Sequence, residues 1–478
     1  MIRFEVNNQD YYDEVLVLVK AFYPMTQVSD KAQERDVIEK TIRVTAKDAF
    51  VTVDIDNRLW ERAVPAGGED RHKSVRDTLK TVLYLALAKE SGRELPWGSL
   101  TGVRPVKLVL GRLEEGMPEE DIRADMKNRY MVSDTKIELS LNVAKREKKL
   151  LEMLNYRDGF SIYIGIPFCP TTCLYCSFTS YPIGAWKKRT DDYVDALLSE
   201  MDFVARYYRG RRPDTVYFGG GTPTTLEPGQ LDRILTALEK LFDLSDLKEL
   251  TVEAGRPDSV TEEKFRVLKA HGVTRISVNP QTMNQKTLDL IGRRHTVEQV
   301  KEAYFLARKC GFDNINMDLI VGLPGEDIED VRITMEEIKK LSPDNLTVHS
   351  LAVKRAAALN LWKEQFRDTI CNTDEIINLT ADYAALMGLN PYYLYRQKNM
   401  AGNFENVGYA REGMEGIYNV LIMEEKQTII AMGAGASSKF VFPEENRIER
   451  IENVKDVKNY IERIDEMIAR KQNFLNGI

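Results

Sequence analysis

The chain has 478 residues, of which 43% are hydrophobic and 29% are charged, a composition typical of a globular protein with two or three domains. Its formal net charge of −7 provides no overall basic surface and argues against nucleic acid as a partner. Apolar runs are too short to span a membrane and the N-terminal residues lack an apolar signal region, so a cytoplasmic location is expected.

Residues 1–155 are predicted to form an α+β domain. We expect a strand at 2–6, a helix at 11–20, and a hairpin in which AFVTVDI and LWERAVP are joined at Asp-Asn. Apolar residues at helical spacing follow from Val75, and Thr135 with Glu138 predicts the start of another helix. Between these helices, PWGSLTGVRPVKL at 96–108 predicts an ordered turn that leads into a helix.

From Ser161 onward, short β-type runs alternate with amphipathic helical segments. The six runs are SIYIGI at 161–166, DTVYF at 214–218, ELTVEA at 249–254, TRISVN at 274–279, INMDLIV at 315–321 and LTVHSL at 346–351. The helical segments between them are 191–206, 229–241, 261–271, 297–310 and 327–340. Six βα units predict a parallel sheet covered by helices, either open or closed into a barrel.

This alternation ends after Ala357. A helical stretch to Met387 is expected next, followed by YYLYRQKNMAGNFENVGYA at 392–410. Two further β-type runs, GIYNVLIM at 416–423 and QTIIAMGAG at 427–435, precede a charged tail from Glu444 that is predicted to be helical.

Polar or glycine-rich residues stand where each of the six strands ends. In order, these are a cysteine loop, Gly219–Thr224, Glu253, Asn279–Gln281, Asp318 with Gly322–Glu326, and His349 with Ser350. The carboxyl ends of parallel strands share one edge, so an active site is predicted there. Alternatively, GGGTPT is only a tight turn, the acids are solvated, and His349 is structural.

Three of the five cysteines, Cys169, Cys173 and Cys176, lie within eight residues. One irregular loop could hold all three thiolates around a compact centre. A structural zinc site would lack a fourth ligand, since no His or further Cys is nearby. Soft thiolates suit an iron–sulfur cluster, and three of them on a four-iron cluster leave one iron open for chemistry. Cys310 and Cys371 are expected to be lone thiols.

CPTTCLYC resembles the CxxxCxxC signature of the radical S-adenosylmethionine (SAM) superfamily, in which three Cys hold a [4Fe–4S] cluster and SAM chelates the open iron. GGGTPT resembles its glycine-rich strand. YIGIPFC, IGRRHT, MDLIVGLPGE and TVHSL resemble the oxygen-independent coproporphyrinogen III oxidase group, and PWGSLTGVRPVKL its HemZ-type branch. The resemblance implies a partial (β/α)6 TIM-like barrel at 156–357, between the α+β domain at 1–155 and a mixed α/β cap region at 358–478.

The resemblance also implies roles for individual residues. Cys169, Cys173 and Cys176 would ligate the cluster. The SAM pocket would comprise Gly220, Gly221, Thr222, Glu253 at the ribose, Arg293 at the carboxylate, Gln281 and Asp318. Tyr163 matches an aromatic residue that lies near the substrate side or a second SAM and, with Gln281 and Asp318, is a candidate catalytic residue. Arg355 and Arg396 are candidates for binding substrate propionates, because guanidinium groups pair with carboxylates in bidentate fashion.

The implied reaction splits SAM into methionine and a 5′-deoxyadenosyl radical, which abstracts a hydrogen from the β-carbon of a porphyrinogen propionate. Loss of CO2 and an electron leaves a vinyl group, a step of haem biosynthesis. A reduced flavodoxin- or ferredoxin-type protein would supply the electron that splits SAM.

Two positions depart from the oxidase pattern. Gly165 stands where the oxidases have His, and Phe178 stands at the second Cys of their CxC. Phe178 resembles the haem-chaperone branch of the group. A haem chaperone, a radical SAM enzyme that opens or methylates a haem-like tetrapyrrole, and a tRNA-modifying enzyme remain alternatives, and the acidic charge disfavours the last of these.

Overall fold

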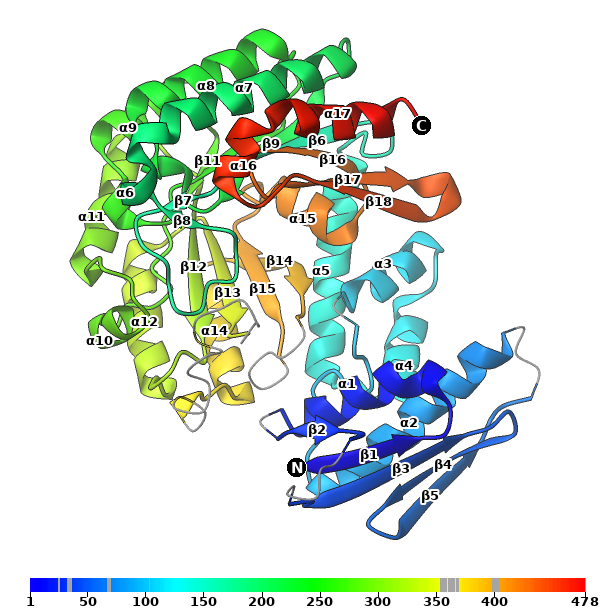
Figure 1. Ribbon diagram of the computed structural model, residues 1–478. Coiled ribbons are helices and arrows are strands. Elements are labelled where there is room, and N and C mark those ends of the chain that lie inside the picture. Colours follow the sequence, from blue (N-terminus) through cyan, green and yellow to red (C-terminus); the bar gives the residue numbers. More distant parts are fainter. Residues whose placement is uncertain are drawn as a thin grey trace. The chain divides into compact units, whose positions relative to one another are not determined.

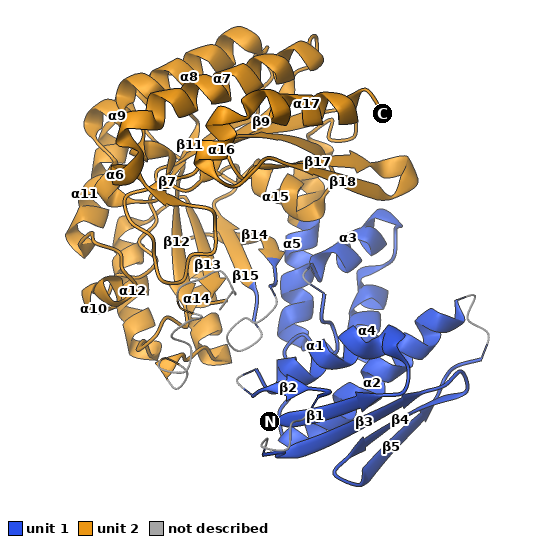
Figure 2. Cartoon of the chain, in the orientation of Figure 1, with its two compact units in different colours: residues 1–145, 395–405 blue, residues 146–394, 406–478 orange. Residues whose placement is uncertain are grey.

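The computed structural model describes residues 1–24, 26–31, 37–66, 70–102, 104–352, 359, 366, 369–397 and 404–477. The chain divides into two compact units (Figure 2). The first comprises residues 1–145 and 395–405, and the second comprises residues 146–394 and 406–478. Among the described residues, no helix combines the length and the apolar character needed to cross a membrane.

The first unit contains a five-stranded sheet in the order β2-β1-β3-β4-β5. The strands are β1 (Ile2–Val6), β2 (Val28–Ser29), β3 (Lys40–Ala46), β4 (Phe50–Ile55) and β5 (Arg58–Ala63). The predicted hairpin is confirmed as β4–β5, and its turn residues Asp56 and Asn57 have positive φ angles. β3 was not predicted from the sequence; it pairs in parallel with β1.

Helices of the first unit bury the apolar face of this sheet (Figure 1). The predicted helices correspond to α1 (Tyr12–Phe22), α2 (Arg71–Ser91), α3 (Val106–Glu114) and the start of α5 (Asp134–Glu152), while α4 (Glu119–Tyr130) lies between α3 and α5. The longer of the two segments of the first unit, residues 1–145, ends inside α5.

The second unit contains an eleven-stranded sheet in the order β14-β15-β13-β12-β11-β10-β9-β6-β16-β17-β18. All six predicted strands are present and pair in parallel: β6 (Phe160–Ile166), β9 (Pro213–Gly220), β10 (Glu249–Glu253), β11 (Arg275–Ser277), β12 (Ile315–Val321) and β13 (Asn345–Ser350). β13 pairs onward with β15 (Asn406–Ala410) rather than with β6, so the barrel is partial. This confirms the predicted α/β class.

The helices between these strands also follow the prediction and cover the outer face of the sheet (Figure 1). They are α7 (Thr190–Tyr207), α8 (Pro228–Leu241), α9 (Glu262–Ala270), α11 (Val297–Lys309) and α12 (Ile328–Leu341). Helices on the outside leave the carboxyl ends of the six strands on one edge, where the loops of the candidate site begin.

The C-terminal region joins the barrel sheet, so the predicted ranges 156–357 and 358–478 lie in the second unit apart from residues 395–405. β16 (Thr428–Met432) extends the sheet in parallel beside β6, and β17 (Ser437–Phe442) and β18 (Arg447–Glu452) follow as a hairpin. β14 (Asn390–Tyr395) is the edge strand at the other end of the sheet. This region also contains the helices α14 (Asp374–Leu386), α16 (Val457–Glu462) and α17 (Ile464–Leu475).

Two predictions for this region are wrong. GIYNVLIM is not a strand but the helix α15 (Ile417–Glu424), whose first backbone N–H groups are bound by the buried Glu249 carboxylate: Ile417 N and Tyr418 N donate to Glu249 Oε2 at 2.5 and 3.4 Å. A carboxylate at this end accepts hydrogen bonds from backbone N–H groups that have no partner within the helix. The tail from Glu444 contains β18 before its helices, because the alternating run RIERIE pairs with β17.

Candidate active site at the strand ends

The loop after β6 carries the three cysteines. It passes through the short strand β7 (Phe168–Cys169), and it is fastened to the segment before α11 by two hydrogen bonds. Leu174 N donates to Ile291 O at 3.0 Å, and Thr171 Oγ1 donates to Gly292 O at 3.2 Å. The loop is therefore anchored on both β6 and the IGRRHT segment.

The three thiols lie near one another on this loop, with Cys173 buried and the other two partly exposed. Burial raises the pKa of Cys169 to about 11; a contact with the Thr222 hydroxyl at 3.5 Å opposes the rise and the neighbouring thiols add to it. A thiolate here needs a strong cation, such as iron, to hold it deprotonated. Among the described residues no three His, Cys, Asp or Glu side chains converge as closely as metal ligands do, so the fit of a cluster rests on the number and softness of these donors.

Arg256, which follows β10, reaches the cysteine loop. Its Nη1 lies 3.5 Å from Cys173 Sγ, and its Nη2 donates to Thr171 Oγ1 at 3.1 Å. Asp258 holds the guanidinium from the other side at 2.8 and 2.9 Å. Arg256 was not predicted from the sequence, although its place directly after the third strand could have indicated it.

The glycine stretch at the end of β9 packs directly against the cysteine strand. Gly221 N donates to Ile166 O and Thr222 N donates to Phe168 O, both at 2.7 Å. A Cβ atom on Gly221 would lie 2.5 Å from Phe168 O, and Gly220 has a φ of 106° that favours glycine. The run of glycines is thus required by close backbone packing, which also sets the position of Thr222 beside Cys169.

Glu253, at the end of β10, and Asp318, in the middle of β12 rather than at its predicted end, are partly buried residues whose carboxyl groups titrate differently. Burial raises the pKa of Glu253 to about 7, although Tyr217 donates a hydrogen bond to it at 2.6 Å. Burial would also raise the pKa of Asp318, but His349, whose Nε2 lies 3.9 Å from Asp318 Oδ2, and a hydrogen bond from Asn316 leave this pKa below its ordinary value. One site thus holds a readily protonated acid and an ionised acid.

Asp318 is held by two amides. Asn279 Nδ2 donates to Asp318 Oδ2 at 2.8 Å and Asn316 Nδ2 donates to Asp318 Oδ1 at 2.7 Å. Gln281, two residues beyond Asn279, has a φ of 68°, and its backbone bonds to β12 on both sides. A left-handed, non-glycine residue held in this way is typical of functional sites.

Arg293 forms hydrogen bonds to three segments near the carboxyl ends of the parallel strands. Its Nη2 donates to Gly255 O at 2.9 Å and Asn279 O at 2.6 Å, and its Nη1 donates to Tyr175 Oη of the cysteine loop at 3.0 Å. The guanidinium is buried and its Nε has no hydrogen-bond partner in the described part of the chain. This cation is therefore rigidly placed and retains a donor.

Tyr163, on β6, is part of a stack of aromatic rings. Its ring centroid is 6.3 Å from that of Tyr217, which in turn is 4.4 Å from that of Tyr418. Tyr418 comes from α15 and was not predicted, because its run was interpreted as a strand. Burial raises the pKa of the Tyr163 hydroxyl, which is therefore neutral at ordinary pH.

The two candidates for binding substrate propionates, Arg355 and Arg396, stay predictions. Arg355 lies outside the described residues. Arg396 belongs to the first unit, where it is buried, donates to Leu100 O at 2.7 Å and lies over the Trp97 ring. Burial lowers the pKa of Arg396 to about 10.

The two departures from the oxidase pattern have different surroundings. A Cβ atom on Gly165 would lie 3.3 Å from Met432 O and 3.4 Å from the Tyr163 ring, so a histidine there would require its neighbours to move. Phe178, in contrast, is 70% exposed on the cysteine loop. An exposed aromatic residue of this size beside a site is suited to contact a ligand or a partner.

A model of the radical SAM superfamily matches residues 163–338. The oxygen-independent coproporphyrinogen-III oxidase-like protein HemZ of Bacillus subtilis is 41% identical over 417 residues, which cover 86% of this chain and 83% of HemZ. This chain belongs to the radical SAM superfamily. Within it, the chain groups with HemZ and the coproporphyrinogen III oxidases, and the cofactors of this radical SAM protein are a [4Fe–4S] cluster and SAM.

Two further proteins are similar to this radical SAM protein. The heme chaperone HemW of B. subtilis is 31% identical over 64% of this chain and 76% of HemW. The structure of coproporphyrinogen III oxidase (HemN) from Escherichia coli covers 67% of this chain and 72% of its own, with a TM-score of 0.52 and 23% identity. The structural match shows a shared fold.

Proposed function

We propose that this protein catalyses the oxygen-independent oxidative decarboxylation of coproporphyrinogen III propionates to vinyl groups. The observation that carries the proposal is the likeness to HemZ along 86% of the chain, together with three thiols, a glycine stretch and two unlike acids at one sheet edge. The reaction would take place in the cytoplasm, with a reduced flavodoxin- or ferredoxin-type protein as the electron donor.

In this proposal each residue near the carboxyl ends of the parallel strands has a role of its own. Cys169, Cys173 and Cys176 hold the cluster, and the backbone of Gly220, Gly221 and Thr222 approaches SAM. When bound, the cluster and SAM supply the radical that takes a hydrogen atom from the substrate. Arg293 binds the SAM carboxylate and Glu253 binds the ribose. Gln281 and Asp318 complete the pocket, and Tyr163 keeps water out on the substrate side.

Mass analysis of products tests this proposal. Protein reconstituted anaerobically with iron and sulfide is mixed with reductant, SAM and coproporphyrinogen III, and the tetrapyrroles are followed by mass spectrometry. We expect harderoporphyrinogen and protoporphyrinogen together with 5′-deoxyadenosine. A tetrapyrrole that gains a methyl group, or 5′-deoxyadenosine formed while coproporphyrinogen stays intact, would contradict decarboxylation.

A haem chaperone is the second candidate function, because Phe178 is 70% exposed where the oxidases carry a cysteine and HemW is among the relatives. This candidate predicts that the protein binds haem in a titration and does not convert coproporphyrinogen. Phe178→Ala should weaken that haem binding, whereas Phe305→Ala, at a 59% exposed phenylalanine on α11, should not.

Arg256→Gln is expected to lower the reduction potential of the cluster and to slow SAM cleavage about 10- to 100-fold, as loss of an outer-shell partner does at other metal sites. The reason is that a donor 3.5 Å from Cys173 Sγ stabilises the more negative, reduced cluster. Redox titration followed by electron paramagnetic resonance measures the potential. Arg266→Gln, on the exposed face of α9, is the control, and an equal potential in both variants would exclude the role.

SAM binding is expected to tighten as the pH rises through about 7, the pKa of the buried Glu253 carboxyl. Below this pH the carboxyl is protonated, and above it the carboxylate accepts hydrogen bonds from the ribose hydroxyls more strongly. Tyr217→Phe removes the hydrogen bond that opposes the raised pKa, so it should move the transition to higher pH. Calorimetric SAM titrations on both sides of neutrality measure it; a pH dependence that persists in Glu253→Gln would assign the transition to another group.

A further inference from the structure

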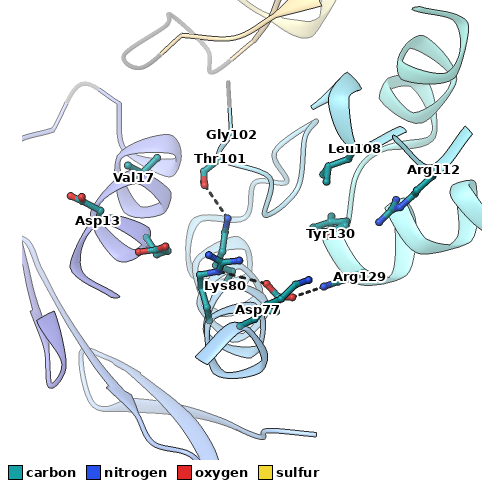
Figure 3. Close-up of a pocket in the computed structure, with 13 residues that line it drawn as sticks. Asp13, Val17, Asp77, Lys80, Thr101, Gly102, Leu108, Arg112, Arg129 and Tyr130 are labelled. Atoms are coloured by element: carbon teal, nitrogen blue, oxygen red, sulfur yellow. Dashed lines mark hydrogen bonds and ion pairs between the residues drawn. The ribbon is translucent and has the colours of Figure 1, made fainter. Parts of the chain in front are cut away.

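The segment 96–108, singled out for its Trp, Gly and Pro residues, has no part in the reaction proposed above. In the first unit this segment borders a cavity of about 590 Å³ (Figure 3). The other walls are α1, α2, α3 and the C-terminal end of α4. The cavity is large enough for an organic molecule rather than a single ion.

The turn that borders this cavity is held rigidly. Trp97 is fully buried, and its Nε1 donates to Glu405 Oε2 at 2.7 Å. Gly98 has a φ of 54°, and a Cβ atom on it would lie 1.9 Å from Tyr130 O, the atom that accepts a hydrogen bond from Ser99 N at 2.8 Å. This wall of the cavity is therefore preformed, which lowers the cost of binding a ligand.

Lys80 is a cation in the cavity that makes no ion pair with any described residue. Its Nζ donates to Thr101 Oγ1 at 3.0 Å, as Figure 3 shows, and no ion pair of Lys80 is present in the described part of the chain. Burial lowers the pKa of this ammonium group, and the nearby Glu14 carboxylate only partly offsets the effect. An ammonium group that has lost its contacts with water and donates to a hydroxyl is strongly stabilised when an anion binds beside it.

Arg112 provides a second cation on another wall. It pairs with Asp125 and lies over the Tyr130 ring, with 5.9 Å between the guanidinium carbon and the ring centroid. Its Nη1 is buried and has no hydrogen-bond partner among the residues described. Lys80 comes from α2 and Arg112 from α3, so the two cations offer donors from different sides.

The rest of the lining favours an anion with an apolar body. Five basic and three acidic side chains line the cavity, and one of the acids, Asp77, is already paired with Arg129 at 2.6 Å (Figure 3). Val17, Leu108 and the Tyr130 ring supply apolar surface between the charges. The lining therefore combines excess positive charge with contact area for carbon atoms.

We propose that this cavity binds a small organic anion with at least two acid groups, carboxylate or phosphate. One acid group meets Lys80 and another meets Arg112, while the body of the ligand lies against Tyr130 and Leu108. This site is independent of the proposed decarboxylation, since it requires neither the cysteine loop nor SAM.

Isothermal titration calorimetry of the full chain tests the site with three probes: citrate, ATP and coproporphyrin III. Citrate and coproporphyrin carry carboxylates and ATP carries phosphates, so the preferred probe identifies the acid group. Lys80→Met and Arg112→Met are each expected to raise the Kd of that probe about 10- to 100-fold, because hydrogen bonds to charged groups are strong. Lys89→Met, at an exposed lysine later in α2, should leave the Kd unchanged.

A second pair of variants avoids substitution of a buried group. Leu108→Glu places a negative charge at the 38% exposed rim of the cavity and should weaken binding, whereas Leu85→Glu, at a 47% exposed position of α2 outside the lining, should not. Failure of the wild-type protein to bind any of the three probes would overturn the proposal. So would a Kd that is the same in wild type, Lys80→Met and Leu108→Glu.

Discussion

Cys173→Ala is expected to abolish cleavage of SAM, an effect larger than the roughly 10- to 100-fold caused by loss of an outer-shell partner of a metal. Cys173 is the buried thiol of the three and the one that Arg256 contacts. With two thiols left, the loop no longer has the three ligands that leave a single iron open for SAM. Anaerobic assay of 5′-deoxyadenosine, with iron and sulfide content measured on the same samples, checks this result.

Two other thiols of the chain provide matched controls. Cys310, at the end of α11, and the exposed Cys371 lie outside the cysteine loop. Cys310→Ala and Cys371→Ala should retain the full iron content and rate of SAM cleavage. A Cys173→Ala protein that still cleaves SAM at the wild-type rate would refute the assignment of the cluster to this loop.

Gly221→Ala is expected to have the second-largest effect. The added Cβ atom would lie 2.5 Å from Phe168 O, so the end of β9 and the cysteine strand must separate. Overpacking of this kind costs about 1–3 kcal/mol of folding stability. Because a misplacement of about 1 Å in a site can cost about 100-fold in rate, SAM cleavage should fall by about that factor.

Gly229→Ala is the matched control for this change. Gly229 lies in the first turn of α8, and a Cβ atom there meets nothing within 4 Å. It should keep both the melting temperature and the SAM-cleavage rate of the wild type. Wild-type cleavage in Gly221→Ala would show that the close approach of β9 to Phe168 does not position the site.

The six parallel strands could be predicted because each is an apolar run with a polar or glycine-rich ending, a local signal. The same signal was misleading for GIYNVLIM, which is helical because the distant Glu249 binds its first N–H groups. Periodicity alone does not separate a short buried helix from a strand. Tertiary contacts thus decided the structure of this run, whose local pattern was ambiguous.

In the candidate site, too, some residues could be predicted from local sequence signals and others only from the fold. Glu253 was predictable because it ends β10, and Gln281 because it follows β11, whereas Asp318 lies in the middle of β12 rather than at the predicted strand end. Tyr418 was not, since it reaches the edge from α15, far away in the sequence. The packing reason for the glycine run was equally hidden, because only the fold brings Gly221 against Phe168.

Transfer of deuterium tests the central claim most directly. Coproporphyrinogen III deuterated at the β-carbons of its propionates is incubated with reconstituted protein, reductant and SAM, and 5′-deoxyadenosine is analysed by mass spectrometry. We expect deuterium in the 5′-deoxyadenosine together with vinyl-bearing product, because the radical abstracts hydrogen from that carbon. Unlabelled 5′-deoxyadenosine with unconverted porphyrinogen would contradict the proposed reaction.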